Sequence, residues 1–192
     1  MEKIIFKYSC LLLIVISIIS CKSNSPTEVI NKSSDNEIMP LKVGNQWIIK
    51  ESNPNSLTQF VYDTISVIRD TVLDNQQWFI SYSGLGHGRP IYKNTVNGLL
   101  EYDSNGAVIR LKYPVAGGTT YNFNDQIVKV LSVNDTIDVP AGKFVCYHYD
   151  FGLMEYWYSP KIGLVKSQEY VEYQSGIRKI INISELKSYK IK

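Results

Sequence analysis

Residues 99–113 of the chain read Leu-Leu-Glu-Tyr-Asp-Ser-Asn-Gly-Ala-Val-Ile-Arg-Leu-Lys-Tyr. Two runs of strand-forming residues, Leu99–Asp103 and Val108–Tyr113, flank the tripeptide Ser104-Asn105-Gly106. An Asn-Gly pair between such runs is the strongest short signal for a β-hairpin, because these residues tolerate the positive φ angles of tight hairpin turns. The stretch therefore predicts two antiparallel strands joined by a tight turn.

The same pattern continues on both sides of this hairpin. Further strands are expected at Gln46–Lys50, Leu57–Val72 (one long strand or a bent pair), Trp78–Tyr82, Thr119–Phe123, Ile127–Val133, Lys143–Tyr149, Glu155–Tyr158, Leu164–Tyr173 and Ile177–Ile183. Only Ile183–Tyr189 has the spacing of a short helix. Strands recurring about every 8–12 residues predict an all-β protein, a single antiparallel meander of ten or more strands forming a half-barrel, barrel or sandwich. A parallel α/β fold is excluded because crossover helices are missing.

The first twenty residues have the pattern of an export signal. Lys3 and Lys7 precede an apolar run, Cys10–Ile19. A membrane-spanning helix needs roughly 20 apolar residues, and this run is about half that length. We therefore interpret residues 1–20 as a signal peptide and not as a permanent membrane span.

Ile18-Ile19-Ser20-Cys21 resembles the lipobox of bacterial lipoproteins. In that family the cysteine receives diacylglycerol, the peptide is cut before it, and the new amine is acylated. Ile18 replaces the more usual Leu. The resemblance implies that Cys21 is lipidated and that the partner of the chain is a lipid bilayer. Two or three acyl chains would anchor the protein in that bilayer essentially permanently. An ordinary signal peptide with an incidental cysteine is the alternative.

Processing at Cys21 divides the chain into three parts. Removal of residues 1–20 leaves 172 of the 192 residues. Residues 21–38 are the lipidated cysteine and a polar tether, which as a flexible coil would reach roughly 24 Å. Residues 39–192 form the β domain. In some bacterial lipoproteins, acidic residues just after the lipidated cysteine direct export to the cell exterior. No acidic residue directly follows Cys21, so we expect this chain at the periplasmic face of the outer membrane.

Composition excludes several classes of protein. The chain is 44% hydrophobic, which argues against a disordered polyelectrolyte. Its 20 basic residues nearly balance 18 acidic ones, so nothing indicates nucleic acid as a partner. After processing and lipidation, Cys146 is the one free thiol, and no intramolecular disulfide can form. With two histidines in the whole chain, we expect neither a metal site nor a cofactor.

Two segments resemble a group of bacterial lipoproteins of the Bacteroidetes type. Pro40–Trp47 reads PLKVGNQW, which is similar to a PLKVGNxW opening, and residues 139–147 and 156–166 are similar to a VPAGxFxCY…YWYSPxIGLVK pattern. The resemblance implies a half-barrel of the lipoprotein-carrier type and no established activity. Pro140, Gly142 and Pro160 also have a plain role in turns, and Trp47 and Trp157 are large enough to dominate a core.

The candidate catalytic pair is Cys146 and His148, which lie two residues apart on one strand face. Same-face neighbours on a strand are about 6.5–7 Å apart at Cα, too far for a nucleophile and its base. A buried cysteine acting as a small hydrophobic residue is the expected role. We therefore predict no catalytic residue and a protein that is not an enzyme.

The most unusual loop is Ser83–Pro90, which reads SGLGHGRP. Its glycines could bind an anion with help from His87 and Arg89, although it fits no phosphate-binding motif. A hairpin loop is the expected role, and His87 and Arg89 are the weak candidates for ligand binding. The many tyrosines indicate an aromatic core or a surface that contacts sugar or lipid.

These features predict a membrane-anchored, non-catalytic lipoprotein of the cell envelope that binds an apolar ligand or another envelope component. A protein-interaction or scaffold module is the first alternative, and an envelope hydrolase is the second. A continuous apolar cavity would favour the apolar ligand. A filled interior with an exposed apolar patch would favour the interaction module.

Overall fold

Twelve antiparallel strands form one sheet in the computed structural model, which describes residues 37–192 apart from 57–58, 86–87 and 175. The strands are β1 (Gln46–Ser52), β2 (Phe60–Leu73), β3 (Gln76–Ser83), β4 (Ile91–Thr95), β5 (Gly98–Asp103), β6 (Gly106–Lys112), β7 (Thr120–Phe123), β8 (Gln126–Val139), β9 (Gly142–Asp150), β10 (Met154–Ser159), β11 (Gly163–Glu172) and β12 (Arg178–Lys190). The described residues contain no helix, and so none with the length and apolar character to cross a membrane. The predicted all-β antiparallel fold is confirmed.

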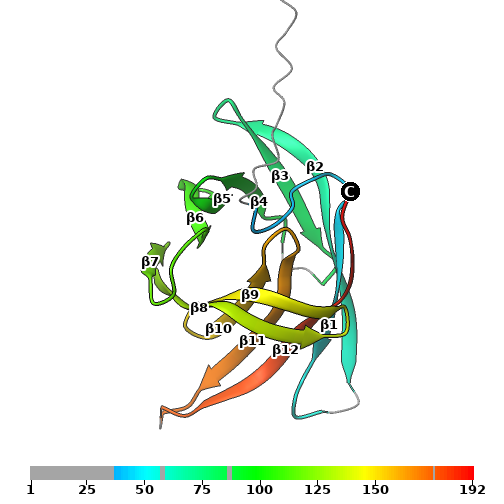
Figure 1. The fold of residues 1–192 in the computed structure, drawn as a ribbon, viewed down its shortest axis with the longest axis vertical. Helices are drawn as coiled ribbons and strands as arrows, with labels where there is room; N and C mark the ends of the chain where they lie inside the picture. The colour runs from blue at the N-terminus through cyan, green and yellow to red at the C-terminus, as the bar shows by residue number, and fades with distance from the viewer. Residues whose placement is uncertain (1–36, 57–58, 86–87, 175) are drawn as a thin grey trace, which may run out of the picture. The chain divides into compact units, whose positions relative to one another are not determined.

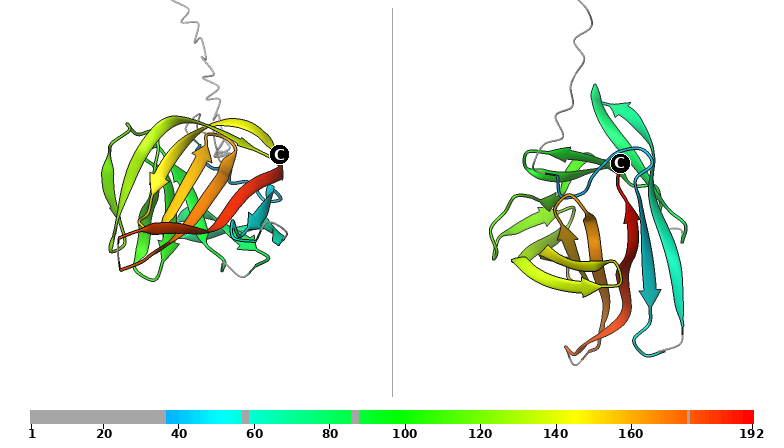
Figure 2. Two further views of the ribbon diagram at one scale, coloured as in Figure 1. Left: turned by 90° about the horizontal axis from the view of Figure 1, so that it is seen from below. Right: turned by 45° about the vertical axis from the view of Figure 1, so that its right-hand side comes forward.

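The sheet is built from two meanders that meet at its centre. Its order is β6-β5-β4-β3-β2-β1-β12-β11-β10-β9-β8-β7. Strands that follow one another in sequence pair, except β6 and β7, and β1 pairs with β12 at the centre. The strands curve around a common interior and make a nearly closed, barrel-like sheet (Figures 1 and 2). The sheet is therefore barrel-like and not a two-sheet sandwich, and since it is not fully closed, β6 and β7 are its two edges.

The helix predicted at Ile183–Tyr189 is wrong, because these residues belong to β12. The reason is a β-bulge opposite Ile48 and Ile49, which pair with Ser188 and Leu186 and leave Lys187 without a partner residue. A bulge adds one residue to a strand. It therefore spaces the apolar residues Leu186 and Tyr189 three apart, which in sequence imitates the period of a helix.

The predicted strands are otherwise found with small changes of boundary, and one strand was not anticipated. The stretch Leu57–Val72 corresponds to one long strand, β2, whose pairing with β3 shifts between Val67 and Arg69. Strand β8 extends to Val139 and carries two irregularities in its pairing with β9. Such bulges increase local bending and twist, which helps a sheet curve into a barrel. The unanticipated strand is β4.

A single hydrophobic core fills the space inside the sheet. Trp47 and Tyr149 are its largest fully buried side chains, whereas Trp78, also buried, packs apart from this core against Tyr102. Side chains along β8 alternate between the core and solvent, as the sequence predicts: Val128 and Val130 are completely buried, whereas Ile127 is 61% exposed. Ile38, the last residue of the predicted tether, is also completely buried, so the chain joins the core from that residue on.

Tyrosine hydroxyl groups bind the edge strand β6 from two other strands, the opposite edge β7 and the inner strand β9. The hydroxyl of Tyr121, in β7, donates a hydrogen bond to the backbone carbonyl of Arg110 in β6, at 2.8 Å, and accepts one from the backbone N–H of Lys112, at 3.4 Å. The hydroxyl of Tyr149 donates to the carbonyl of Lys112, at 2.8 Å. Side chains thus satisfy backbone groups of an edge strand that would otherwise be open to pairing with another chain.

Candidate functional site

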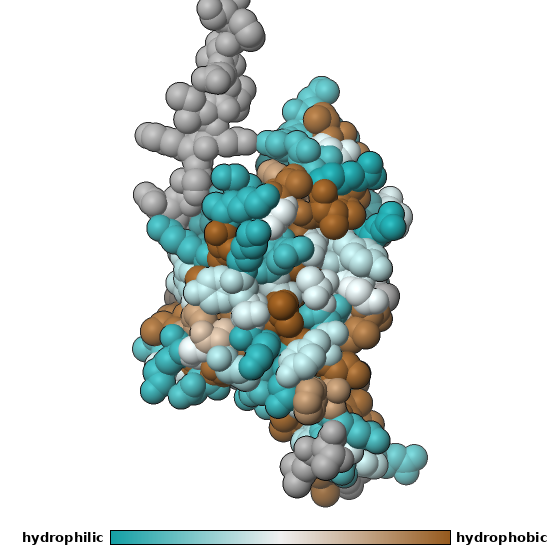
Figure 3. Space-filling view, turned by 90° about the vertical axis from the view of Figure 1, so that its right-hand side faces the viewer, coloured by the Kyte–Doolittle hydropathy of each residue, from teal (hydrophilic) through white to brown (hydrophobic). Residues whose placement is uncertain are grey.

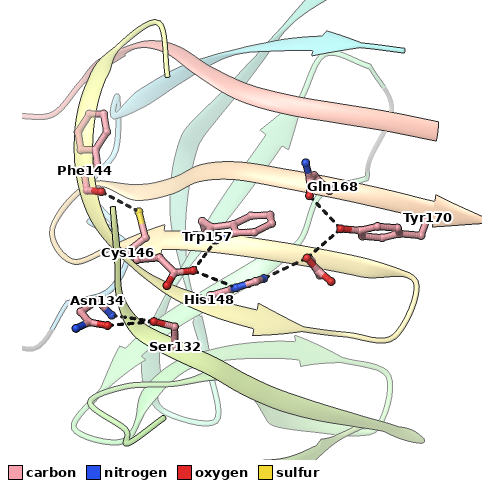
Figure 4. A network of polar contacts seen from close by, with 10 residues as sticks. Ser132, Asn134, Phe144, Cys146, His148, Trp157, Gln168 and Tyr170 are labelled. Atoms are coloured by element: carbon pink, nitrogen blue, oxygen red, sulfur yellow. Dashed lines mark hydrogen bonds and ion pairs between the residues drawn. The ribbon is translucent and has the colours of Figure 1, made fainter. Parts of the chain in front are cut away.

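A polar network surrounds His148 on β9 (Figure 4). Its Nδ1 atom lies 3.1 Å from a carboxylate oxygen of Asp135, and its Nε2 atom lies 3.2 Å from a carboxylate oxygen of Glu155. The ring stacks on Trp157 with centroids 4.1 Å apart, and the Trp157 indole N–H donates to Asp135 at 3.2 Å. The hydroxyl of Tyr170 donates to Glu155 at 3.0 Å and extends the network to β11.

Both ring nitrogens of His148 are engaged, and this limits what the network can do. A neutral imidazole has a single N–H, so a doubly protonated ring is needed to donate to Asp135 and Glu155 together. Burial disfavours ionisation of Asp135, but hydrogen bonds from Ser132 and Trp157 and the charge of His148 outweigh it and lower the pKa of Asp135. Both ring nitrogens thus face carboxylate groups, and the network links β8, β9, β10 and β11.

Cys146 does not form a catalytic pair with His148. The thiol is completely buried, and its sulfur lies 3.8 Å from the carbonyl oxygen of Phe144. Burial, together with the negative charge of Asp135, raises the pKa of Cys146 to about 12. A reactive cysteine needs a lowered pKa and access to solvent. Within the described part of the chain, no group of three or more His, Cys, Asp and Glu side chains could hold a metal ion.

The first residues of the loop Ser83–Pro90 contact a buried carboxylate, that of Asp63. Asp63 accepts hydrogen bonds from the Ser83 hydroxyl and from the backbone N–H of Leu85, the latter at 3.2 Å. The Arg89 guanidinium lies over the Tyr82 ring, 5.7 Å from its centroid. His87 and Cys21 both lie outside the described residues. Of the predicted lipidation and ligand-binding residues, Cys21, His87 and Arg89, only Arg89 is among the described residues, and it packs on an aromatic ring.

Aromatic side chains and one arginine occupy the interior near β6. The Arg110 side chain is 19% exposed and pairs with Glu101 at 2.7 Å. Its guanidinium lies between 5.4 and 5.8 Å from the ring centroids of Phe123, Phe151 and Tyr156. Tyr121, Tyr149 and Tyr158 are buried in the same core. This is the aromatic core that the tyrosine content indicated, and the position of Arg110 within it was not expected from the sequence.

An open groove of about 470 Å³ lies at the end of the β1–β2 hairpin. Strand β12 lies beside this end of β1, since Ser52 pairs with Ile183 on one side and with Phe60 on the other. The groove is lined by Glu51, Ser52, Asn53, Gln59, Phe60, Val61 and Asn182. Phe60 is 50% exposed and Val61 is 52% exposed, so an aromatic ring and an aliphatic side chain are available to a ligand.

The lining of the groove combines three kinds of chemistry. Three carboxamides, a hydroxyl and a carboxylate supply hydrogen-bond donors and acceptors. Phe60 and Val61 supply apolar surface, and Lys50 lies 5.2 Å from the centre of the Phe60 ring. A ligand site commonly joins apolar surface to a few placed polar groups, in a volume of roughly 300–1,000 Å³. Sequence reasoning missed this site because its parts are more than 120 residues apart and carry no motif.

Comparison with known proteins gives likenesses of fold. No protein-family model matches the chain, and no curated protein matches its sequence. A "putative lipoprotein" from Parabacteroides distasonis has 13% sequence identity and a TM-score of 0.49, with 81% of this chain and 99% of that chain covered. A "putative exported protein" with a YmcC-like fold, from Bacteroides fragilis, has 15% identity and a TM-score of 0.46, covering 81% and 100%. These structural neighbours come from Bacteroidetes.

Proposed function

We propose that this protein is a lipoprotein of the bacterial envelope that acts by binding, without catalysis. The lipobox-like sequence ending in Cys21 supports a lipid anchor, which we assign to the periplasmic face of the outer membrane. The burial of Cys146 and the engagement of both nitrogens of His148 support a role without a nucleophile. Binding is then the activity for which the domain offers a formed surface.

The groove at the end of the β1–β2 hairpin is the proposed binding site, and a neutral glycan of the envelope is its ligand. The observation that carries this proposal is the lining of the groove, where three carboxamides stand beside Phe60. Amides hydrogen-bond well to neutral hydroxyl groups in both directions, and an aromatic face packs against the C–H face of a sugar ring. The aromatic filling of the interior favours this envelope component over an apolar ligand.

Titration calorimetry tests this proposal. The lipidated protein in detergent is titrated with the neutral oligosaccharide fraction released from the host envelope. We expect saturable binding, and Phe60→Ala and Asn182→Ala each to weaken it about tenfold, the equivalent of one lost contact of about 1.4 kcal/mol. Val72→Ala is the matched control, because Val72 is an exposed residue of the same strand, β2, twelve positions from Phe60. Binding that is equal in all variants refutes the site.

The same titration tests the absence of catalysis. Mass spectrometry of the oligosaccharide after long incubation with the protein is expected to show unchanged material. Cleaved products that disappear in His148→Gln would show instead that the network of Figure 4 is an active site.

A protein partner is the second candidate, and one observation favours it. Phe60 and Tyr62 are each about half exposed on β2, and their rings pack edge to face with centroids 5.4 Å apart. Figure 3 shows apolar residues gathered in separate patches on the side where β1 and β2 lie. Tyr62 does not line the groove. Because Tyr62 supports the Phe60 ring, Asn182→Ala separates the candidates: it should weaken glycan binding and spare binding to a protein partner that contacts Phe60 and Tyr62.

The lipid anchor has its own test. Cys21→Ser should abolish labelling of the protein with radioactive palmitate in cells and leave the uncleaved precursor. Cys146→Ser is the control, and its labelling should match the original chain. Continued labelling of the Cys21→Ser chain contradicts the lipobox interpretation.

A further inference from the structure

Residues 37–45 connect the tether to the β domain. They lie beside two turns and beside residues 188–192. The backbone carbonyl of Glu37 accepts a hydrogen bond from the N–H of Lys161, at 2.8 Å, in the β10–β11 turn. The carbonyl of Met39 accepts one from the Asn94 side chain, at 2.7 Å, next to the β4–β5 turn. The N–H of Lys192 donates to the side chain of Asn45 at 3.0 Å. We call the four segments 37–45, 93–98, 159–163 and 188–192 the junction rim.

The junction rim has more basic than acidic side chains, although the domain as a whole is nearly neutral. It contains one acidic residue, Glu37, and five lysines, namely Lys42, Lys93, Lys161, Lys190 and Lys192. The other described residues include eleven basic and fourteen acidic side chains. The β2–β3 hairpin projects past the rim in Figure 1, and its Arg69, Asp70 and Asp74 lower the local positive charge by one. Positive charge is therefore concentrated at the end of the domain that the tether joins.

Apolar side chains are exposed among these lysines. Val96, in the β4–β5 turn, is 72% exposed, and Val43 and Tyr189 are 41% and 42% exposed. Val72, near the tip of the β2–β3 hairpin, is 69% exposed. Lysines mixed with exposed aliphatic and aromatic groups are typical of surfaces that meet lipid headgroups, where the ammonium groups pair with phosphates and the apolar groups enter the interface.

The length of the tether restricts where this surface can be. Sixteen residue steps join Cys21 to Glu37. Even fully extended they span at most about 58 Å. A domain held this close to a bilayer meets its headgroups at a high effective concentration, so a weak electrostatic contact suffices to orient it. This step rests on the proposed lipid anchor.

We propose that the junction rim docks on anionic phospholipid headgroups of the membrane that holds Cys21. This gives the domain a fixed orientation. The rim contains Lys190, at one end of β12, whereas Asn182 of the groove lies eight residues along the same strand. At about 3.3 Å per residue the groove stands roughly 25 Å from the rim. Docking by the rim therefore turns the groove away from the lipid and toward the aqueous space.

Depth-dependent fluorescence quenching tests this orientation. The lipidated full chain carries one fluorophore, at Val96→Cys in the rim or at Ile177→Cys beside the groove end of β12, and is reconstituted in vesicles with brominated lipid tails. Ile177 is 65% exposed, which makes it a matched position. The native Cys146 does not take the label, because it is completely buried. We expect the Val96 probe to be quenched at least about twofold more than the Ile177 probe when about one third of the lipid is phosphatidylglycerol.

Charge is then varied on both partners. Vesicles of phosphatidylcholine alone, or 1 M salt, where the screening length is about 3 Å, should remove the difference between the probes. Lys42→Gln with Lys190→Gln should reduce it, whereas Lys129→Gln with Lys179→Gln, exposed lysines outside the rim, should not. Equal quenching of both probes in anionic vesicles, or quenching indifferent to charge, overturns the proposal. A chain that fails to float with any vesicle shows instead that the anchor itself is wrong.

Discussion

The tyrosine hydroxyl groups that bind the edge strand β6, from Tyr121 on β7 and from Tyr149 on β9, can be removed one at a time. Tyr149 is completely buried, and its hydroxyl donates to the carbonyl of Lys112 on the edge strand β6, at 2.8 Å. Tyr149→Phe keeps the ring and its packing and leaves that carbonyl without this donor. A buried polar group that loses its partner costs about 1–3 kcal/mol. We expect a loss of unfolding free energy of that size.

The loss is measurable by two methods. For a domain of roughly 155 residues, each 1 kcal/mol lowers the melting temperature by about 2–4 °C, so Tyr149→Phe should lower it by about 2–12 °C. Urea unfolding followed by tryptophan fluorescence gives the free energy directly. Tyr121→Phe should also speed hydrogen exchange at the backbone N–H of Lys112, which donates to the Tyr121 hydroxyl.

Tyr173→Phe is the control, because this side chain is 53% exposed. It should change stability by less than about 0.5 kcal/mol. The interpretation fails if Tyr149→Phe is as harmless as the control, or if Tyr121→Phe leaves exchange at Lys112 unchanged. Either result would mean that the sheet edges are held by ring packing alone.

Three further outcomes are expected. Cys146, with a pKa raised to about 12, should react with Ellman's reagent only after unfolding in urea, and reaction in the native state would contradict its burial. Gly98→Ala places a Cβ atom 1.9 Å from the carbonyl oxygen of Leu111 and should lower the free energy of unfolding by at least about 3 kcal/mol. Gly106→Ala is also at positive φ but meets open space, and should lower it by about 1–2 kcal/mol. Burial raises the pKa of Tyr92 from its ordinary value of 10.0 to about 12. Because the unfolded chain loses this proton first, the free energy of unfolding should be intact below about pH 10 and should fall between about pH 10 and 12, by up to about 1.4 kcal/mol per pH unit. A free energy of unfolding that does not change in alkali would contradict this.

Local chemistry in the sequence was sufficient to predict the fold class and most strands. The Asn105-Gly106 turn joins β5 and β6, and the alternation around Val128 and Val130 marks the core face of β8. Strand β4 gave no such signal, because all five of its residues are half-buried and no alternation results. The bulge at Lys187 shifted the apolar period of β12, so the pattern there indicated a helix.

The groove and the network around His148 could not be predicted because they depend on register. The distance from Asn182 to Ser52 is fixed by how β12 pairs with β1, and a change of one residue would turn the side chain to the other face. Likewise, the sequence placed His148 near Cys146 but gave no sign of Asp135 and Glu155 on the neighbouring strands. Side chains on adjacent strands meet only once the whole sheet has its pairing.

The central pairing of β1 with β12 also has a consequence for how the chain folds. Each meander, β1–β6 or β7–β12, consists of contacts between neighbours in sequence, which form early because they close short loops. The β1–β12 ladder instead brings together residues more than 130 positions apart, such as Ser52 and Ile183. This ladder therefore closes the longest loop of the sheet and carries its largest loop-closure entropy, which slows folding relative to a sheet of neighbouring strands alone.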